Sequence, residues 1–565
     1  MAETFADFFF TKIESIRKDF PLTEVPENVQ TADISFPKLE SLQETSESRL
    51  KHLIETSNSK SCHLDPIPTS LLKECTDILL PLLCKIVNSS LASATVPNEL
   101  KVATVTPTLK KPTLDNEDMK NYRPISNLPF LAKLIEKEVV SQLNNHMTSH
   151  GLHEVYQSAY KASHSTETAL LKVQNDILQA IDQRECVMLV LLDLSAAFDT
   201  VDHHKLLHRL ESSFGIAGTA LQWLSSYLTG RSQSVHIKGI SSKPRSLQYG
   251  VPQGSVIGPL GFITYSSPLG EICRHHEIMY HLYADDTQLY LAFTADDQLD
   301  KTQQLENCIE EIKQWMSSNF LKMNESKTEF LLLSSLHLHL KLTEPCRLNI
   351  GNSLIPSSTS ARNIGAIFDS HMNMSDHISA VCRSCYLHIR NIGKIRPYLT
   401  QKATEQLIHA FISSKLDHLN SLLTGLPDYQ IKRLQHIQNT AARIVTRSNK
   451  YQNITPVLIS LHWLPVRYRI EYKIALLVYK CLHDLAPAYL INLITVYTPA
   501  RSLRSGTDRL LTQPAARTVR YGERTFSYAA PSIWNALPKH LRLCDNFELF
   551  KRDLKTFLFK TAYRI

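Results

Sequence analysis

The sequence predicts an α+β protein of several domains. Apolar residues recur with helical spacing over most of the chain before residue 180, whereas strand-like runs prevail between 187 and 333. Past Asp376 the pattern is mostly helical, and it is interrupted by prolines at Pro397, Pro427, Pro456, Pro465 and Pro487. A chain of 565 residues is long enough for roughly three or four domains.

The first 60 residues predict a helical linker segment. Apolar residues at helical spacing mark one or two amphipathic helices, at Phe5, Phe8, Phe9, Ile13 and Ile16. A polar stretch rich in Ser, Thr and Glu follows from 43 to 60. An apolar helical pattern then covers 65–98, and a short strand over 102–109 ends at two lysines, Lys110 and Lys111.

Two helices lead to a buried strand. Asn127 can cap a helix through Asn145, and Ser165 can cap another through Ala180. The six-residue apolar run 187–192 has the length and composition of a strand buried on both faces.

Strand signals continue through the middle of the chain. Alternating residues over 233–248 predict a hairpin, and the runs 279–284 and 287–293 predict two strands joined by an acidic tip, Asp285-Asp286. A helix is expected over 298–320 and a strand over 329–333.

The composition excludes several classes of protein. With 43% hydrophobic and 20% charged residues, the chain is neither disordered nor fibrous. Its apolar runs are shorter than the roughly 18 residues that a membrane span needs, and no secretory signal opens it. Eleven scattered cysteines do not form a disulfide framework. We therefore expect an intracellular protein of the cytoplasm and nucleus, with no membrane partner.

The charge is distributed unevenly. The net charge is +7, but residues 371–565 hold 28 Lys and Arg against 11 Asp and Glu, while the first 370 residues hold 33 against 43. A basic last third favours binding of a polyanion, and a solvated basic surface is the alternative.

Three carboxylates form the strongest chemical signal. Asp193 ends the buried strand, and Asp285-Asp286 lie at the tip of the predicted hairpin. Carboxylates that meet at one sheet edge repel each other unless divalent cations neutralise them, which is how paired Mg²⁺ ions are held for phosphoryl transfer. Each aspartate alone is also ordinary turn chemistry.

Five motifs in a fixed order carry a resemblance to a known family. They are Asn121 to Ser126, Leu192 to Thr200, Gly250 to Ser255, Tyr283 to Asp286, and Leu321 to Asn324 leading to Lys327. In this order they resemble the reverse transcriptases of non-LTR retrotransposons, closest to the chicken-repeat type of long interspersed elements. Segments of the second half also look like that lineage, among them Arg362 to Gly365, Leu461 to Pro465 and Trp534 to Pro538.

The resemblance implies a right-hand polymerase with fingers, palm and helical thumb, and a mostly helical basic C-terminal region. The implied segments are a helical linker at 1–60, fingers and palm at 61–345, primer grip and thumb at 346–445, and the basic region at 446–565. It implies that Asp193, Asp285 and Asp286 are catalytic and bind Mg²⁺, with Mn²⁺ as an alternative.

The resemblance also implies a set of substrate-binding residues. Phe198 would exclude a ribose 2′-hydroxyl, and Gln253 and Gly254 would line the nucleotide pocket. Arg123 with Lys110 or Lys111 would clamp the triphosphate, and Lys327 would lie near the pyrophosphate. For Phe198 a core aromatic, and for Lys327 an exposed loop lysine, remain open alternatives. Residues 362–368 would form the hairpin that grips the primer end.

The implied activity is RNA-directed DNA polymerisation by two-metal nucleotidyl transfer. Its partners would be template RNA, a DNA primer or target, and deoxynucleoside triphosphates; the sequence does not predict an oligomeric state. The alternative is a catalytically inactive remnant that binds nucleic acid. The intact Asp193, Asp285 and Asp286 argue against that alternative. Gly261, which stands where the family usually has Leu, favours it, and so does the expectation that the chain lacks the N-terminal endonuclease of complete elements.

Two further groups of residues can be explained by structural roles. Cys382, Cys385 and His388 have zinc-like spacing, but on a helix they fan out and do not converge, so buried cysteines are favoured. Trp463 and Trp534 stand near arginines and could stack on bases or pack in a core.

Overall fold

The structure is a computed structural model, and it describes residues 1–20, 36–60, 62–342, 346–351, 353–499 and 508–565. Positions 61 and 345, which bound the predicted fingers and palm, lie outside the described residues. The chain divides into two compact units. Unit 1 comprises 1–160, 193–275 and 308–326, and unit 2 comprises 161–192, 276–307 and 327–565. Because both units draw on several stretches of sequence, the predicted functional segments remain predictions.

Unit 1 is built around a mixed sheet with strand order β2-β1-β5-β6, and β7 also pairs with β5. Its strands are β1 (Val102–Leu109), β2 (Tyr122–Asn127), β5 (Arg231–Ile237), β6 (Ile240–Ser241) and β7 (Arg245–Leu247). Strand β1 pairs antiparallel with β2 and parallel with β5. The predicted strand over 102–109 is confirmed, and so is a hairpin within 233–248, whose turn lies at Lys238-Gly239 between β5 and β6.

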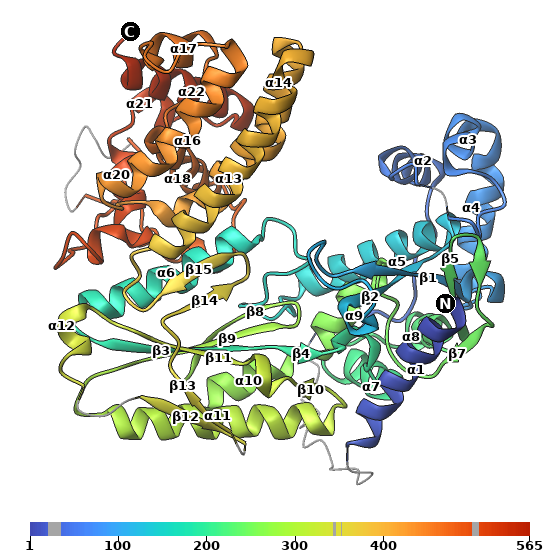
Figure 1. The fold of residues 1–565 in the computed structure, drawn as a ribbon. Coiled ribbons are helices and arrows are strands. Elements are labelled where there is room, and N and C mark those ends of the chain that lie inside the picture. Colours follow the sequence, from blue (N-terminus) through green and yellow to red (C-terminus); the bar gives the residue numbers. More distant parts are fainter. Residues whose placement is uncertain (21–35, 61, 343–345, 352, 500–507) are drawn as a thin grey trace. The chain divides into compact units, whose positions relative to one another are not determined.

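Helix α1 (Ala2–Lys18) packs on β5 and β6 of this sheet. Its Phe5 and Phe9 form a small buried core with Val105 and Val235. Figure 1 shows the helix beside β5 and β7. The helix predicted here is confirmed, and its apolar face anchors it to unit 1.

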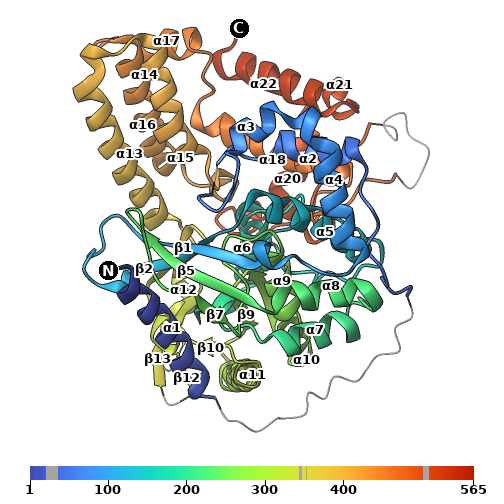
Figure 2. The same cartoon turned by 90° about the vertical axis from the view of Figure 1, so that its right-hand side faces the viewer.

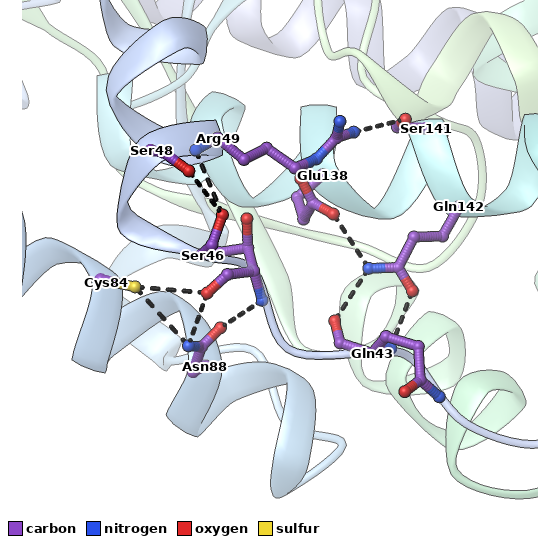
Figure 3. Close-up of polar contacts among 10 residues, drawn as sticks. Gln43, Ser46, Ser48, Arg49, Cys84, Asn88, Glu138, Ser141 and Gln142 are labelled. Atoms are coloured by element: carbon purple, nitrogen blue, oxygen red, sulfur yellow. Dashed lines mark hydrogen bonds and ion pairs between the residues drawn. The ribbon is translucent and has the colours of Figure 1, made fainter.

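Helices α2 (Glu47–Thr56), α3 (Thr69–Glu74), α4 (Thr76–Ala92) and α5 (Phe130–Ser149) form a second part of unit 1. A polar network joins them: Arg49 on α2 donates to Glu138 on α5 at 2.7 Å, and Thr45 exchanges hydrogen bonds with Asn88 on α4 (Figure 3). The polar stretch from 43 to 60 is therefore largely engaged in contacts with neighbouring helices.

The start of α5 differs from the prediction. Asn127 is the last residue of β2, and its amide donates to Thr106 Oγ1 at 3.0 Å instead of capping a helix. Helix α5 begins at Phe130, directly after Pro129. The prediction of an Asn127 cap is wrong because Asn127 pairs with Thr104 in the β1–β2 ladder.

The remaining elements of unit 1 are short. They are β4 (Leu194–Ser195), α7 (His203–Ser212), α8 (Gly218–Leu228), α9 (Ile257–Tyr265), α10 (Pro268–His275) and β10 (Lys322–Met323). Strand β10 pairs antiparallel with β4. Helix α11 (Gln298–Ser318) has residues in both units.

Unit 2 contains an antiparallel sheet with strand order β11-β3-β9-β8. Its strands are β11 (Glu329–Leu333), β3 (Cys186–Leu192), β9 (Asp286–Phe293) and β8 (Met279–Tyr283). Helix α6 (Thr166–Asp182) packs on β3 and β8 (Figure 1). The predicted central strand and the Ser165 cap are confirmed, since Ser165 Oγ accepts from the Thr168 amide.

Two hairpins follow this sheet. The first consists of β12 (Arg347–Ile350) and β13 (Ser353–Pro356), and the second of β14 (Ser360–Asn363) and β15 (Ala366–Asp369). A short helix, α12 (Leu336–His339), precedes them. The β14–β15 hairpin turns at Ile364-Gly365, which confirms a hairpin within the predicted segment 362–368.

The rest of unit 2 is helical, as the sequence predicted. Helices α13 (Ser375–Ile395), α14 (Gln401–Ile408), α15 (Ser414–Asp417) and α16 (Asp428–Thr446) pack together (Figure 2). The later helices are α17 (Ile454–Ser460), α18 (Val466–Leu482), α19 (Ala488–Ile491), α20 (Phe526–Asn535), α21 (Lys539–Arg542) and α22 (Phe547–Tyr563).

Several segments of the C-terminal region pack on helix α6, among them α19, α20 and the turn at Gly522–Arg524. The Asp182 carboxylate accepts hydrogen bonds from the backbone amides of Arg517 and Thr518, at 2.9 and 2.8 Å, and from Thr518 Oγ1. Trp534 is fully buried and Trp463 nearly so, so both tryptophans pack in a core. Part of the C-terminal region thus packs on the helix that covers the unit 2 sheet.

None of the described helices combines the length and hydropathy of a membrane-crossing segment. All eleven cysteines lie in described residues and are free, and most are buried, as predicted.

Candidate functional site

Asp285 and Asp286 lie at the β8–β9 hairpin. Tyr283 pairs with Asp286, so Asp286 is the first residue of β9 and the turn itself is Ala284-Asp285. Ala284 has a positive φ of 57°, a conformation uncommon for a residue with a side chain. Asp286 is exposed and Asp285 half-buried. The hairpin therefore presents acidic groups at one end of the sheet, with local backbone strain of the kind that collects at functional sites.

Asp193 follows the last residue of β3. Leu192, which precedes Asp193, pairs with Thr287, which follows Asp286. The ladder register thus brings the end of β3 and the start of β9 to the same edge of the sheet. Within unit 1, Asn324 Nδ2 donates to Asp193 Oδ2 at 3.3 Å, and the Asn324 amide donates to the Asp193 carbonyl at 2.8 Å.

These aspartates have the donor chemistry of a Mg²⁺ site. Mg²⁺ is usually held by one or two carboxylates together with substrate phosphates, so a complete protein cage is not required. Among the described residues, no three His, Cys, Asp or Glu side chains converge on a common metal position. Carboxylate oxygens are the kind of ligand that Mg²⁺ takes, and metal binding by these aspartates stays a prediction.

The loop from Gly250 to Ser255 is fixed by backbone contacts within unit 1. The Ser126 amide, at the end of β2, donates to the Gln253 carbonyl at 2.7 Å. Gly254 has φ +121°, and a Cβ there would collide with the Ser126 carbonyl oxygen. Glycine is required at this position because backbone conformation and close approach both exclude a side chain.

The same loop is joined to the segment after Asp193. The Val251 amide donates to the Phe198 carbonyl at 2.8 Å, and Gln253 Nε2 donates to Asp199 Oδ2 at 2.8 Å. Burial raises the pKa of Asp199 to about 6, while the Gln253 hydrogen bond and Lys12 oppose this shift. The structure thus brings Phe198, Gln253 and Gly254 into one cluster with Asp199.

Phe198 lies in a 3-10 turn at Ala197–Asp199. Its ring stacks on Phe262 of α9, with centroids 4.8 Å apart and planes 21° apart. Phe262 is fully buried, whereas Phe198 is half-buried. One face of the Phe198 ring therefore rests on the core, and part of its surface remains accessible.

The predicted triphosphate clamp lies on the β1–β2 hairpin. Arg123 on β2 pairs with Thr108 on β1, and Lys110 follows the end of β1. Both side chains are exposed, and Lys110 Nζ donates to the Lys120 carbonyl at 2.7 Å. Because β2 is an edge strand, this hairpin can present cations to a ligand.

Lys327 belongs to unit 2. It ends a 3-10 turn at Glu325–Lys327, just before β11, and its side chain is exposed. Its predicted position near the pyrophosphate stays a prediction.

Sequence reasoning assigned no role to three residues with supporting contacts. Asn324 binds Asp193, Asp199 binds Gln253, and Glu136 binds the Val256 and Ile257 amides. Asn324 and Asp199 lie inside recognised motifs, so their polar character was a usable signal. Glu136 lies in the predicted helix from 127 to 145 and carries no local sign of its contact with residues 256 and 257.

The zinc-like spacing on α13 corresponds to no metal centre. Cys385 is fully buried, and His388 stacks on Phe411 with centroids 5.1 Å apart. The preference for buried cysteines over a zinc site agrees with these contacts.

Unit 2 holds acidic residues at the β8–β9 hairpin, and unit 1 holds a glycine-containing loop joined to the segment of an aromatic residue. Residues 109–368 match the family described as reverse transcriptase (RNA-dependent DNA polymerase). Over this segment, which is less than half of the chain, the sequence is similar to reverse transcriptases, and the predicted right-hand polymerase fold with a helical C-terminal region is confirmed.

Relatives of this chain are polymerases of mobile elements. It is 26% identical over 415 residues to a probable RNA-directed DNA polymerase from transposon BS of Drosophila melanogaster, a match covering 70% of this chain and 44% of the relative. It is 25% identical to the corresponding protein of transposon X-element of that species, over 70% of this chain and 43% of the relative. The chain thus spans less than half of the length of these relatives.

Two further matches extend the comparison. The RNA-directed DNA polymerase from mobile element jockey of Drosophila funebris is 26% identical over 54% of this chain and 33% of its own length. Among solved structures, apo telomerase from Candida tropicalis, truncated from its C-terminal domain, is 10% identical with a TM-score of 0.33, over 55% of this chain and 61% of that chain.

Proposed function

We propose that the protein is an RNA-directed DNA polymerase of a non-LTR retrotransposon of the chicken-repeat type. The observation that carries this proposal is the strand register, in which Leu192 pairs with Thr287 inside a reverse transcriptase domain. The register supports Asp193, Asp285 and Asp286 as one catalytic group. The protein would copy template RNA by extending a DNA primer or target with deoxynucleoside triphosphates.

In this proposal the three aspartates hold Mg²⁺, or Mn²⁺ as an alternative. A bound divalent ion would supply charge neutralisation for the attacking hydroxyl and the leaving pyrophosphate. Asp193, Asp285 and Asp286 would supply the anionic oxygens, and Asn324 would orient Asp193 through its two hydrogen bonds. A single proton or charge change at these carboxylates would therefore act on the chemical step.

The nucleotide would be held by unit 1 residues. Phe198 would face the sugar, where its ring leaves no volume for a 2′-hydroxyl. Gln253 and Gly254 would line the pocket, because the loop is already fixed against Ser126. The exposed cations Arg123 and Lys110 would clamp the triphosphate, a task for which the forked guanidinium is suited.

Within unit 2, Lys327 would stabilise charge near the pyrophosphate, and the β14–β15 hairpin would hold the primer end. The 446–565 region would contribute basic surface for template RNA or target DNA. We propose that the protein acts in the cytoplasm and nucleus, because its template RNA and target DNA would be present there.

The alternative is an inactive remnant that binds nucleic acid. One observation favours it: Gly261 on α9 borders an apolar cavity of about 20 Å³ lined by Leu206, Leu260 and other apolar side chains. An unfilled cavity lowers stability, yet it leaves the aspartates untouched.

Primer extension tests the proposal. Purified full-length protein is incubated with poly(A) template, an oligo(dT) primer, dTTP and Mg²⁺, and product length is measured. We expect template-dependent extension that stops when a chelator removes the metal. Binding of the primer–template without any extension, in Mg²⁺ or Mn²⁺, would favour the remnant.

A further inference from the structure

A buried carboxylate lies directly behind the loop that carries Gln253 and Gly254. Glu136 on α5 is only 2% exposed. Its Oε2 accepts hydrogen bonds from the backbone amides of Val256 at 2.5 Å and Ile257 at 3.1 Å. These amides end the loop and begin α9, where backbone N–H groups have no partner within the helix. Glu136 thus fastens the loop where it enters the helix.

Burying the carboxyl group of Glu136 carries a free-energy cost that its contacts must offset. Burial raises the pKa of its carboxyl, so ionisation is disfavoured, and the two amide hydrogen bonds oppose that shift. The buried Tyr227 side chain lies beside both Glu136 and Ser255. Arg231 Nε and Nη2 have no hydrogen-bond partner among the described residues. Arg231 is also buried, and its charge favours the ionised Glu136. Charge-assisted bonds to backbone amides are among the stronger ones available in a protein.

The loop has separate anchors at its other points. Gln253 is held through its carbonyl by Ser126 and through its side chain by Asp199. Gly250 donates to the Val201 carbonyl at 2.8 Å. Near the end of the loop, Ser255 Oγ donates to the Pro252 carbonyl and accepts from the Gly258 amide, both at 2.9 Å. The amides of residues 256 and 257 themselves are bound by Glu136.

We propose that Glu136 is a positioning residue that sets the loop for nucleotide binding. It acts through the Val256 and Ile257 amides and touches no substrate itself. Weakening its two hydrogen bonds allows the loop to move away from Ser126. The loop conformation in which Gln253 and Gly254 can bind the nucleotide is then less populated. The expected consequence is a higher KM for dNTP at a nearly unchanged kcat. This inference rests on the proposed function.

The chain offers a matched control in Glu138. It lies two residues further along the same helix and is 3% exposed, so its burial is nearly identical. Glu138 instead binds Arg49 at 2.7 Å and accepts from Gln142 at 3.0 Å, both away from the loop (Figure 3). A purely structural role for buried acids on α5 would make the two residues behave alike.

The first experiment compares Glu136→Gln and Glu138→Gln in the full-length protein. The amide keeps the size of the side chain but replaces one carboxyl oxygen by an NH2 donor, which weakens the match to the two backbone N–H groups. We expect Glu136→Gln to raise the KM for dTTP about tenfold, with kcat and the KM for primer–template within about threefold. Glu138→Gln should leave the dTTP KM unchanged. Equal KM shifts in both variants, or no shift in Glu136→Gln, would overturn the proposal.

The second experiment needs no polymerase activity. Amide hydrogen exchange is followed by mass spectrometry in peptides that cover residues 250–258. Exchange should be faster in Glu136→Gln than in the wild type and unchanged in Glu138→Gln. Unchanged exchange in Glu136→Gln would overturn the anchoring role. A wild type that extends no primer would refute the proposed function and the link to nucleotide, while the exchange result would still decide whether Glu136 holds the loop.

Discussion

The strand-end aspartates and the Gly250–Ser255 loop differ in solvent exposure and in the hydrogen bonds that fix them. Asp286 is exposed and Asp285 half-buried, at a turn with one strained residue. The loop is fixed by hydrogen bonds to β2, to the segment after Asp193 and to α5. The aspartates are suited to act through charge, and the loop through position. Charge removal should therefore stop the chemical step, whereas loosening the loop should weaken nucleotide binding.

The largest effect is expected for Asp285→Asn. The change removes one negative charge with almost no change of shape, so extension should fall by roughly 10³-fold or more. Binding of the primer–template and the melting temperature should stay near the wild-type values. The matched control is Asp296→Asn, an exposed aspartate past the other end of β9. Wild-type-like extension by Asp285→Asn would reject the metal assignment.

Phe198→Ala tests whether position also decides which sugar is accepted. The change removes the ring that stacks on Phe262, so preference for dNTP over rNTP should fall by roughly ten- to a hundredfold. Phe198→Tyr keeps the ring volume and should keep the preference. Competition between dTTP and UTP measures both variants. An unchanged preference in Phe198→Ala would show that Phe198 is a core aromatic only.

Asp199→Asn tests the cost of holding the loop with a buried acid. The pKa of Asp199 is raised from 3.8 to about 6, so the folded state binds its proton more tightly than the unfolded state. Stability should therefore fall as pH rises from about 4 to 6 and then level off, by up to about 3 kcal/mol. In Asp199→Asn this part of the loss should be absent. Identical pH profiles of the melting temperature would refute the assignment.

Gly261→Ala has the smallest expected effect, and its sign is opposite. A Cβ at Gly261 would lie 3.6 Å from Leu206 Cδ2, which is ordinary contact beside the apolar cavity. The variant should gain about 1 kcal/mol of unfolding free energy in urea titrations. Gly258→Ala on the same helix is the control, because its Cβ would lie 2.7 Å from Ser255 Oγ and should destabilise the loop. A destabilised Gly261→Ala would contradict this account.

The two regions also differ in how well the sequence predicted them. Buried strands and acidic strand ends leave a local pattern, so β3, β9 and β11 were predicted within a residue or two. The turn was misplaced by one residue, because pairing of Tyr283 with Asp286 depends on the ladder as a whole.

The motif around Asp199 was a signal of a polar role, but the partners of the loop's supports could not be predicted from local pattern. Glu136 is separated from Val256 by 120 residues, and Asp199 from Gln253 by 54. Glu136 lies on helix α5, and a polar residue on a helix is most often solvated, so its sequence neighbours do not mark it as buried. The packing of α1 on β5 was also not predictable from local pattern, because it depends on tertiary contacts of Phe5 and Phe9.

The most direct test of the division between charge and position is single-nucleotide incorporation by rapid quench. The maximum rate and the Kd for dTTP are measured for Asp285→Glu and Gln253→Ala on the same primer–template. We expect Asp285→Glu to lower the maximum rate roughly a hundredfold with a nearly unchanged Kd, and Gln253→Ala to raise the Kd roughly tenfold with a nearly unchanged rate. The reverse assignment, or equal effects on both constants, would contradict the account.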